Sequence, residues 1–214
     1  MPGTRHTVKP VRILIADDHA VVRDALTALL ELEPDIEVVG AVGRADELRP
    51  ALSKTPCDIL LLDLKMDRWV TKDIAELTKS AKVVVLTAAD RDEDIIAALR
   101  EGAHAIVQKS SAAETLREAI RAVAGGVVWI PATLRRRLTS AKFAAVSSEL
   151  LTARESEIVR YVAVGLRNAE VAQRLAITEG TVKIHLNNIF GKLDVRDRVQ
   201  LTLYALRTRL ITLE

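Results

Sequence analysis

Apolar residues between positions 11 and 125 fall into short continuous runs that alternate with stretches of helical spacing. Continuous apolar runs are typical of parallel strands that are covered on both faces. Five such runs predict strands, at residues 11–16, 36–42, 57–62, 82–86 and 105–108. Between them, apolar positions recur three or four residues apart and predict helices at 22–32, 45–53, 71–80, 93–101 and 112–124. This alternation predicts an α/β fold with a doubly wound five-stranded parallel sheet.

The rest of the chain shows only the helical period. Thr152 and Glu155 have the spacing of a capping box, which predicts a helix that begins there and ends near residue 164. Further helices are predicted at 169–175, 178–193 and 198–210. Two short helices joined by a tight turn form the helix-turn-helix pattern, in which the second helix enters the major groove of DNA. We therefore expect an α/β domain at residues 1–126, a linker at 127–147 and a small all-α four-helix domain at 148–214.

Polar residues stand where the predicted strands end, and ligands bind at that edge of an open α/β sheet. Asp17 and Asp18 follow the first strand, Asp63 the third, Thr87 the fourth and Lys109 the fifth. One aspartate at a strand end is usually a helix cap, but five such residues in this order indicate a common site. Crowded carboxylates repel one another unless a hard cation neutralises them, which favours Mg²⁺. A carboxylate beside such a metal can take up a phosphoryl group, whose oxygens Lys109 and Thr87 would contact.

The predicted helix at 178–193 has one apolar face and one polar face, and no glutamate follows Glu179 within it. Lysine and asparagine side chains reach guanine and adenine edges, and isoleucine can contact a thymine methyl group. A solvated polar face is the competing interpretation, but such faces usually carry glutamate as well. The residues expected to contact bases are Lys183, Ile184, Asn187 and Asn188, and those expected to contact phosphates are Arg167, Thr181 and Lys192.

Composition narrows the class of protein. Of 214 residues, 49% are hydrophobic, 28% are charged and only 3% are aromatic, which is typical of a globular domain without an aromatic pocket for a planar ligand. Residues 1–125 carry four more acidic than basic side chains, and residues 126–214 carry six more basic than acidic side chains. This distribution is typical of a sensing module joined to a module that binds a polyanion. The single cysteine excludes an internal disulfide. No apolar run resembles a membrane span or a signal peptide, so we expect a cytoplasmic protein without a membrane partner.

Four segments resemble the receiver domain of two-component response regulators: ILIADDH at 13–19, DILLLD at 58–63, VVLTA at 84–88 and GAHAIVQK at 102–109. The resemblance implies a flavodoxin-like fold and a sensor histidine kinase as the partner that phosphorylates Asp63. It also implies roles for the neighbouring residues. Mg²⁺ would be arranged by Asp17, Asp18, Asp63 and the backbone carbonyl of Lys65, and the phosphoryl group would be contacted by Thr87 and Lys109.

Two features depart from the pattern of that family. Met66 is followed by Asp67 where the family has proline, and the connection from Asp63 to the fourth strand is shorter than usual. The third helix is therefore expected to be shortened or displaced. Ile106 stands where the family has an aromatic ring that swings inward on activation. With isoleucine that rotation has no equivalent, so switching is expected to be weaker or to use another element.

A second resemblance, to the LuxR-type DNA-binding domain, covers nearly all of residues 150–210. It rests on LTARE at 151–155, EVA at 170–172 and TVKIH at 181–185. In that family the last helix makes the dimer contact on DNA, which implies a homodimer on a pseudo-palindromic promoter site. The residues that would form this contact are Val199, Leu203 and Leu206. Covering the core of their own domain is the competing use of these side chains.

Together the two resemblances identify the chain as a member of the NarL/FixJ-type response regulators, which are DNA-binding transcriptional regulators and not enzymes. The main alternative is an atypical regulator that binds DNA through the same domain without phosphorylation. An enzyme that passes a phosphoryl group from Asp63 to a substrate is disfavoured, because no second general acid is evident. A ligand-sensing LuxR regulator is disfavoured by the acidic site and by the scarcity of aromatic residues.

Overall fold

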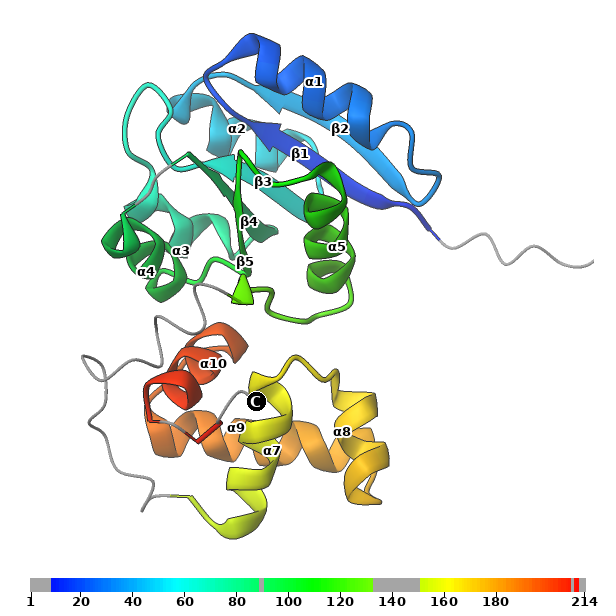
Figure 1. The fold of residues 1–214 in the computed structure, drawn as a ribbon, viewed down its shortest axis with the longest axis vertical. Helices are drawn as coiled ribbons and strands as arrows, with labels where there is room; N and C mark the ends of the chain where they lie inside the picture. Colours follow the sequence, from blue (N-terminus) through cyan, green and yellow to red (C-terminus); the bar gives the residue numbers. More distant parts are fainter. Residues whose placement is uncertain (1–8, 89–90, 133–150, 209, 212–214) are drawn as a thin grey trace, which may run out of the picture.

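The computed structural model describes residues 9–88, 91–132, 151–208 and 210–211, which form an α/β domain followed by a helical domain (Figure 1). The strands of the first domain are β1 (Val11–Ala16), β2 (Ile36–Val42), β3 (Ile59–Asp63), β4 (Lys82–Thr87) and β5 (Ala105–Gln108). All neighbouring strands are parallel, in the order β2-β1-β3-β4-β5. The predicted doubly wound five-stranded sheet is therefore confirmed.

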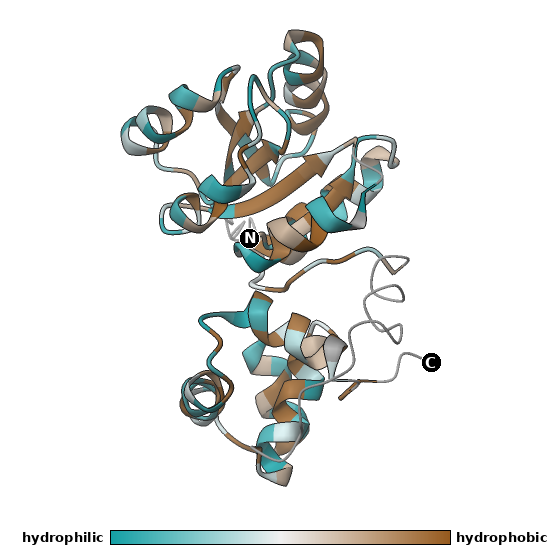
Figure 2. Cartoon of the chain, turned by 90° about the vertical axis from the view of Figure 1, so that its left-hand side faces the viewer, coloured by the Kyte–Doolittle hydropathy of each residue, from teal (hydrophilic) through white to brown (hydrophobic). Residues whose placement is uncertain are grey.

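Helices cover both faces of the sheet. Successive side chains of each buried strand point to opposite faces, and each face contributes to its own apolar cluster. On one face, Ile13, Ile15 and Leu61 pack with α1 (Ala20–Leu30) and α5 (Ala113–Ala124). On the other face, Leu60 and Leu62 pack with three helices. These are α2 (Leu48–Lys54), α3 (Ile74–Leu77) and α4 (Asp92–Arg100). Figure 2 shows the strands as a brown, apolar layer between helices in which teal and brown segments alternate.

The segment between β3 and α3 confirms the expectation that the third helix is shortened. Lys65 and Trp69 form an antiparallel bridge, and the Val70 N–H donates to the Leu64 carbonyl at 3.1 Å. Because residues 64–70 form this tight hairpin, they are not available to lengthen the third helix. Instead of a helix over residues 71–80, a 3₁₀ turn at Thr71–Asp73 leads into the single α-helical turn of α3.

The chain after α5 runs along the free edge of β5. The Trp129 N–H donates to the His104 carbonyl at 2.9 Å, and the Ile106 N–H donates to the Trp129 carbonyl at 3.3 Å. Ala105 and Trp129 thereby form a parallel bridge. The start of the predicted linker is thus attached to the sheet, whereas its residues 133–147, and residues 148–150 of the predicted rear domain, lie outside the described residues.

The rear domain consists of α7 (Ala153–Ala163), α8 (Asn168–Leu175), α9 (Glu179–Leu193) and α10 (Arg198–Arg207). Thr152 and Glu155 form the predicted capping box of α7, and the Thr178 hydroxyl accepts a hydrogen bond from the Thr181 N–H at the start of α9. Helices α8 and α9 are joined by a short turn, as the helix-turn-helix pattern requires. Among the described helices, none has the length and apolar character needed to cross a membrane.

The two domains touch through α4 and α10, which lie against each other. One cluster of buried apolar residues continues from the sheet domain into the rear domain without a break. The helix of the rear domain nearest to the sheet domain in Figure 1 is α10.

Candidate functional site

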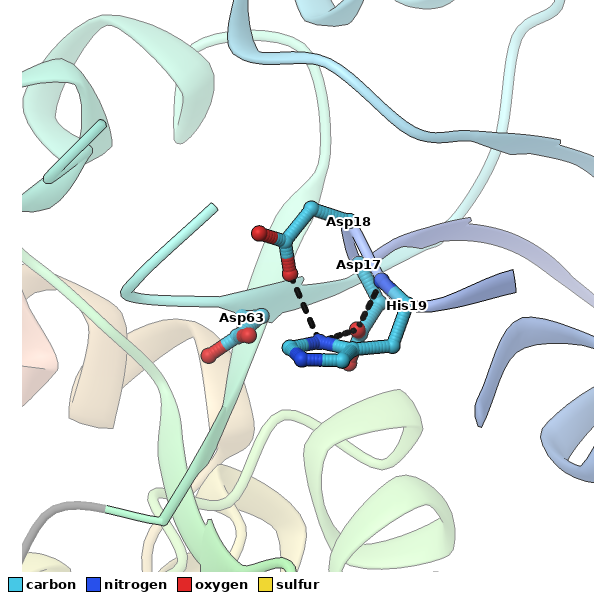
Figure 3. A group of neighbouring side chains, drawn as sticks. All are labelled: Asp17, Asp18, His19 and Asp63. Carbon is cyan, nitrogen blue, oxygen red and sulfur yellow. Dashed lines mark hydrogen bonds and ion pairs between the residues drawn. The ribbon is translucent and has the colours of Figure 1, made fainter. Parts of the chain in front are cut away.

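Three acidic residues from two strand ends meet at one edge of the sheet. Asp17 and Asp63 are buried, with 0% and 4% of their surface exposed, and Asp18 beside them is partly accessible to solvent. Figure 3 shows their carboxylates turned toward one another, together with the ring of His19. One ligand atom from each of these four residues lies within 4.8 Å of the others. The structure therefore brings together the acidic residues that the strand ends predicted.

Lys109 holds two of these carboxylates together. Its Nζ lies 2.6 Å from Asp17 Oδ2 and 2.8 Å from Asp63 Oδ2. Burial raises the pKa of Asp63, and hydrogen bonds from Lys109 and from the Lys65 N–H oppose that rise without cancelling it. Burial alone would lower the pKa of Lys109, but its hydrogen bonds with Asp17 and Asp63 outweigh burial and the pKa is raised. The ammonium is thus the main positive charge within the acidic group.

The residues after β3 and β4 complete the pocket. The Lys65 N–H donates to Asp63 Oδ1 at 3.2 Å, which fixes the backbone beside the carboxylate. Thr87 is buried at the end of β4, and Ala88 follows it along the cavity wall. A small side chain at position 88 leaves room next to Asp63.

His19 belongs to this site although no role was predicted for it. Its Nδ1 lies 2.7 Å from Asp18 Oδ1 and 3.2 Å from Asp17 Oδ1, and 67% of the side chain is exposed. The signal in the sequence was its position directly after the two aspartates. Adjacency alone did not show that the ring folds back over them.

Asp63, His19 and Lys109 line a cavity of about 1100 Å³. The cavity is also lined by Lys65 and Trp69 of the hairpin after β3, by Lys72 of the following 3₁₀ turn, by Ala97 of α4 and by Glu101 just after α4. Trp69 is 48% exposed. The hairpin places this tryptophan beside the cavity, whose other described lining residues include no phenylalanine, tyrosine or second tryptophan.

The helix-turn-helix presents the second candidate surface. Val182, Leu186 and Ile189 of α9 are buried in the rear domain. The opposite face of α9 is exposed, and Ile184 has 64% of its surface accessible. The exposed residues on that face include all four that were expected to reach bases, namely Lys183, Ile184, Asn187 and Asn188.

The residues expected to meet phosphates differ in how firmly they are held. Arg167 pairs with Glu170 and Lys183 pairs with Glu179, both on the exposed surface. The hydroxyl groups of Thr181 and Thr178 lie 2.8 Å apart. Lys192 instead binds Glu155, whose side chain is buried in the rear domain. Its ammonium therefore pairs with a buried carboxylate, while 40% of the Lys192 side chain stays exposed.

The three residues expected to make a dimer contact on α10 are buried within this single chain. Val199 is 1% exposed, Leu203 is 7% exposed and Leu206 is 0% exposed. Helix α10 packs on α7 of its own domain and on α4 of the sheet domain. The competing use of these side chains, in covering a core, is therefore present in the structure.

Comparison with known families defines the class of the protein. The family described as "Response regulator receiver domain" matches residues 13–121, and the family described as "Bacterial regulatory proteins, luxR family" matches residues 149–205. The chain belongs to the response regulators in which a receiver domain is followed by a LuxR-type regulatory domain. This agrees with the resemblances found in the sequence.

Individual relatives are similar along almost the whole chain. LiaR, a transcriptional regulatory protein of Bacillus subtilis strain 168, is 37% identical over 210 residues, which cover 94% of this chain and 99% of LiaR. VraR, a response regulator protein of Staphylococcus aureus strain NCTC 8325, is 35% identical over 213 residues, with 94% and 99% covered. Among solved structures, the RcsB response regulator of Salmonella typhimurium has a TM-score of 0.58 at 26% identity, and 92% of this chain and 98% of that chain are covered. An RcsB–DNA complex has a TM-score of 0.56 at 25% identity, with 92% and 98% covered.

Proposed function

We propose that this response regulator binds promoter DNA as a homodimer and that phosphorylation of Asp63 by a sensor histidine kinase controls the binding. The observation that carries the proposal is the position of Lys109, whose ammonium bridges Asp17 and Asp63 at the floor of an open cavity. A buried carboxylate next to a cation, and open to solvent on one side, is arranged to accept an incoming phosphoryl group.

The chemistry follows from the positions of these groups. An oxygen of the Asp63 carboxylate would form a P–O bond while the P–N bond of the kinase phosphohistidine breaks and the imidazole leaves. Lys109 lies close enough to pair with one phosphoryl oxygen, and Thr87 stands at the end of the neighbouring strand with a hydroxyl to offer another. Ala88 leaves space for the added group.

The residues present fit a Mg²⁺ ion. The carboxylates of Asp17, Asp18 and Asp63 converge, and oxygen atoms are the ligands that this cation prefers. These three side chains and the backbone carbonyl of Lys65 would hold it. When bound, the ion would neutralise the charge that gathers on the phosphoryl oxygens.

The rear domain would read DNA through the exposed face of α9. Lys183, Ile184, Asn187 and Asn188 would contact base edges in the major groove. Arg167, Thr181 and Lys192 would meet the phosphates. Because the printed description of one RcsB structure names two RcsB dimers bound to two DNAs, we infer a symmetric dimer here as well, formed through Val199, Leu203 and Leu206 on a pseudo-palindromic site.

The same proposal places the protein in the cytoplasm, where promoters lie, and assigns it no catalytic turnover on a substrate. The domain boundaries that go with it are 1–126 for the receiver, 127–147 for the linker and 148–214 for the DNA-binding domain.

One observation favours a second candidate function, a regulator that binds DNA without phosphorylation. Ile106 is 1% exposed and lies in the apolar cluster beside α4. An aromatic residue at this position would have a ring to rotate inward, whereas the isoleucine is already inside. Phosphorylation-dependent switching therefore has to act through another element in this protein.

The two functions are distinguished by the intact mass of the full chain after incubation with acetyl phosphate, with and without Mg²⁺. A single phosphoryl adduct that requires Mg²⁺ and is absent from Asp63→Asn supports the first function. Promoter affinity is then compared between the phosphorylated protein and Asp63→Asn. No adduct, or equal affinity, favours the phosphorylation-independent regulator.

A further inference from the structure

Trp69 keeps about half of its surface in contact with solvent. It is 48% exposed, whereas the other tryptophan of the sequence, Trp129, is packed against an apolar cluster of the sheet domain. A single exposed apolar side chain on a protein surface needs no explanation. Trp69 is different because it lines the cavity that also contains Asp63.

The hairpin after β3 connects Trp69 to the carboxylate of Asp63 through two backbone contacts. The Lys65 N–H donates to Asp63 Oδ1 at 3.2 Å, and Lys65 pairs directly with Trp69 across the hairpin. Side chains of residues that pair directly across antiparallel strands lie on the same face, with their Cβ atoms about 5 Å apart. In agreement with this, Lys65 and Trp69 both line the cavity.

The backbone around Trp69 is fixed while its side chain stays exposed. The Met66 N–H donates to the Arg68 carbonyl and the Val70 N–H donates to the Leu64 carbonyl, both at 3.1 Å. The side chains of Leu64, Met66 and Val70 are buried and anchor the hairpin in the core. A ligand that contacts the indole would therefore meet a surface that is already in place, which lowers the entropy cost of binding.

The proposed phosphotransfer places the leaving group in this cavity. The attacking oxygen of Asp63 and the leaving nitrogen lie roughly in line through the phosphorus. As the P–O bond forms, the P–N bond breaks and its electron pair stays on the imidazole nitrogen. The ring keeps the proton of its other nitrogen and leaves as neutral imidazole. Because Asp63 is buried at the end of β3, the side of the phosphorus opposite to it is the open cavity that Trp69 lines.

We propose that Trp69 makes this receiver domain select phosphoryl donors whose leaving group is a planar ring, by stacking on that ring while Asp63 is phosphorylated. This inference rests on the proposed function, in which Asp63 is the acceptor. Lys65 and Lys72 line the same cavity and attract the phosphoryl group, which all donors have in common. Trp69 acts on the leaving group, in which the donors differ.

Two small donors separate these contributions. Phosphoimidazole and phosphoramidate both carry the phosphoryl group on nitrogen, but the first releases a planar ring and the second releases ammonia. The intact mass of the full chain, followed over time with Mg²⁺ present, gives the rate of phosphorylation by each donor. Trp69→Leu removes the ring and keeps an apolar side chain, whereas Trp69→Phe keeps a ring. Lys72→Leu is the matched control, because it shortens a side chain that lines the same cavity and removes no ring.

We expect Trp69→Leu to lower kcat/KM for phosphoimidazole about fivefold and to change the value for phosphoramidate less than about twofold. The loss should appear as a higher KM with kcat unchanged, because the ring is stacked both before and during the transfer. Trp69→Phe should recover most of the loss. Lys72→Leu should change the two donors by the same factor, so that their ratio stays that of wild type.

Equal losses with the two donors overturn the proposal, because they would assign Trp69 to the structure of the hairpin. Unchanged rates with both donors overturn it as well. Failure of the proposed function is recognised in the wild-type protein, which would then form no adduct on Asp63 with either donor, and the selection of donors falls with it. If wild type forms the adduct with both donors and only the selectivity is absent, phosphorylation of Asp63 holds and the role of Trp69 is overturned.

Discussion

Lys192 Nζ lies 2.8 Å from Oε1 and 2.7 Å from Oε2 of Glu155, so α9 is joined to α7 through a buried carboxylate. Burial raises the pKa of Glu155, but hydrogen bonds from Lys192 and Thr152 outweigh burial and the pKa is lowered. The carboxylate also accepts from the Thr152 N–H and hydroxyl. One of the residues proposed to contact DNA phosphates therefore also stabilises the fold of the rear domain.

The first prediction concerns this ion pair. Lys192→Met leaves Glu155 charged in a buried position, and we expect it to lower the free energy of unfolding by about 2 kcal/mol. Thermal unfolding of the full chain measures the loss. Lys183→Met is the control, because Lys183 pairs with Glu179 on the exposed surface and should cost less than about 0.5 kcal/mol. Equal stabilities for the two variants would show that the pair with Glu155 contributes nothing.

The second prediction concerns reading of DNA. Lys183→Ala should weaken promoter binding by about 1–3 kcal/mol and leave phosphorylation of Asp63 unchanged, since the side chain lies on the exposed face of α9 far from the acidic site in the chain. Lys79→Ala removes the same charge from an exposed ion pair of the receiver domain and should not alter binding. Promoter affinities measured at one salt concentration decide the matter. A Lys183 variant that binds like wild type contradicts the assignment of α9.

The third prediction concerns Lys109. Lys109→Met removes the ammonium that lies between Asp17 and Asp63, so their mutual repulsion should lower the melting temperature when no divalent cation is present. Added Mg²⁺ should then raise the melting temperature more in the variant than in wild type, because the cation replaces a lost positive charge. Lys65→Met is the control, because the Lys65 side chain is exposed. A Mg²⁺ shift equal to that of wild type would count against a cation site here.

The fourth prediction concerns pH. Burial lowers the pKa of His104. The negative charge of Asp197 opposes this lowering, and the positive charge of Lys82 adds to it. The ring accepts a hydrogen bond from the Val83 N–H at 3.2 Å through Nδ1, which requires that this nitrogen be unprotonated. Because the unfolded chain takes up the proton first, stability should be fully present above about pH 6.5 and fall as the pH drops below it.

His104→Asn keeps an acceptor for the Val83 N–H and has no charge to gain. We expect its free energy of unfolding to change less than that of wild type between pH 7.5 and about 5.5. Denaturant unfolding at several pH values measures both slopes. Parallel slopes would assign the pH dependence to other groups.

The sheet and its acidic edge were predictable because they depend on local patterns. The strands at 11–16 and 36–42 agree residue for residue with the predicted runs. The first lies inside the sheet, where strands are continuously apolar, whereas the second is an edge strand in which only Ile36 is buried. The aspartates, Thr87 and Lys109 then meet because parallel strands end at the same edge.

The features that sequence patterns missed depend on contacts between distant residues. The hairpin at Lys65 and Trp69 is closed by backbone hydrogen bonds, which leave no side-chain signal. Lys192 lies on the polar side of α9, but its partner Glu155 is 37 positions away. The strand-like pairing of Trp129 with β5 and the contact of α4 with α10 likewise join distant segments. The hydrophobic periodicity of each segment does not indicate which other segment it contacts.

The contact between α4 and α10 is intramolecular, and this sets the strength that it needs. Two surfaces on one chain meet at an effective concentration of about 1 mM, whereas two copies of a regulator meet only at their concentration in solution. A small polar contact such as that of Gln200 with Arg100 is therefore enough to help hold α4 and α10 together. The contact within one chain does not depend on protein concentration, whereas the proposed dimer does, so the response of such a regulator would depend on how much of the protein is present as well as on how much is phosphorylated.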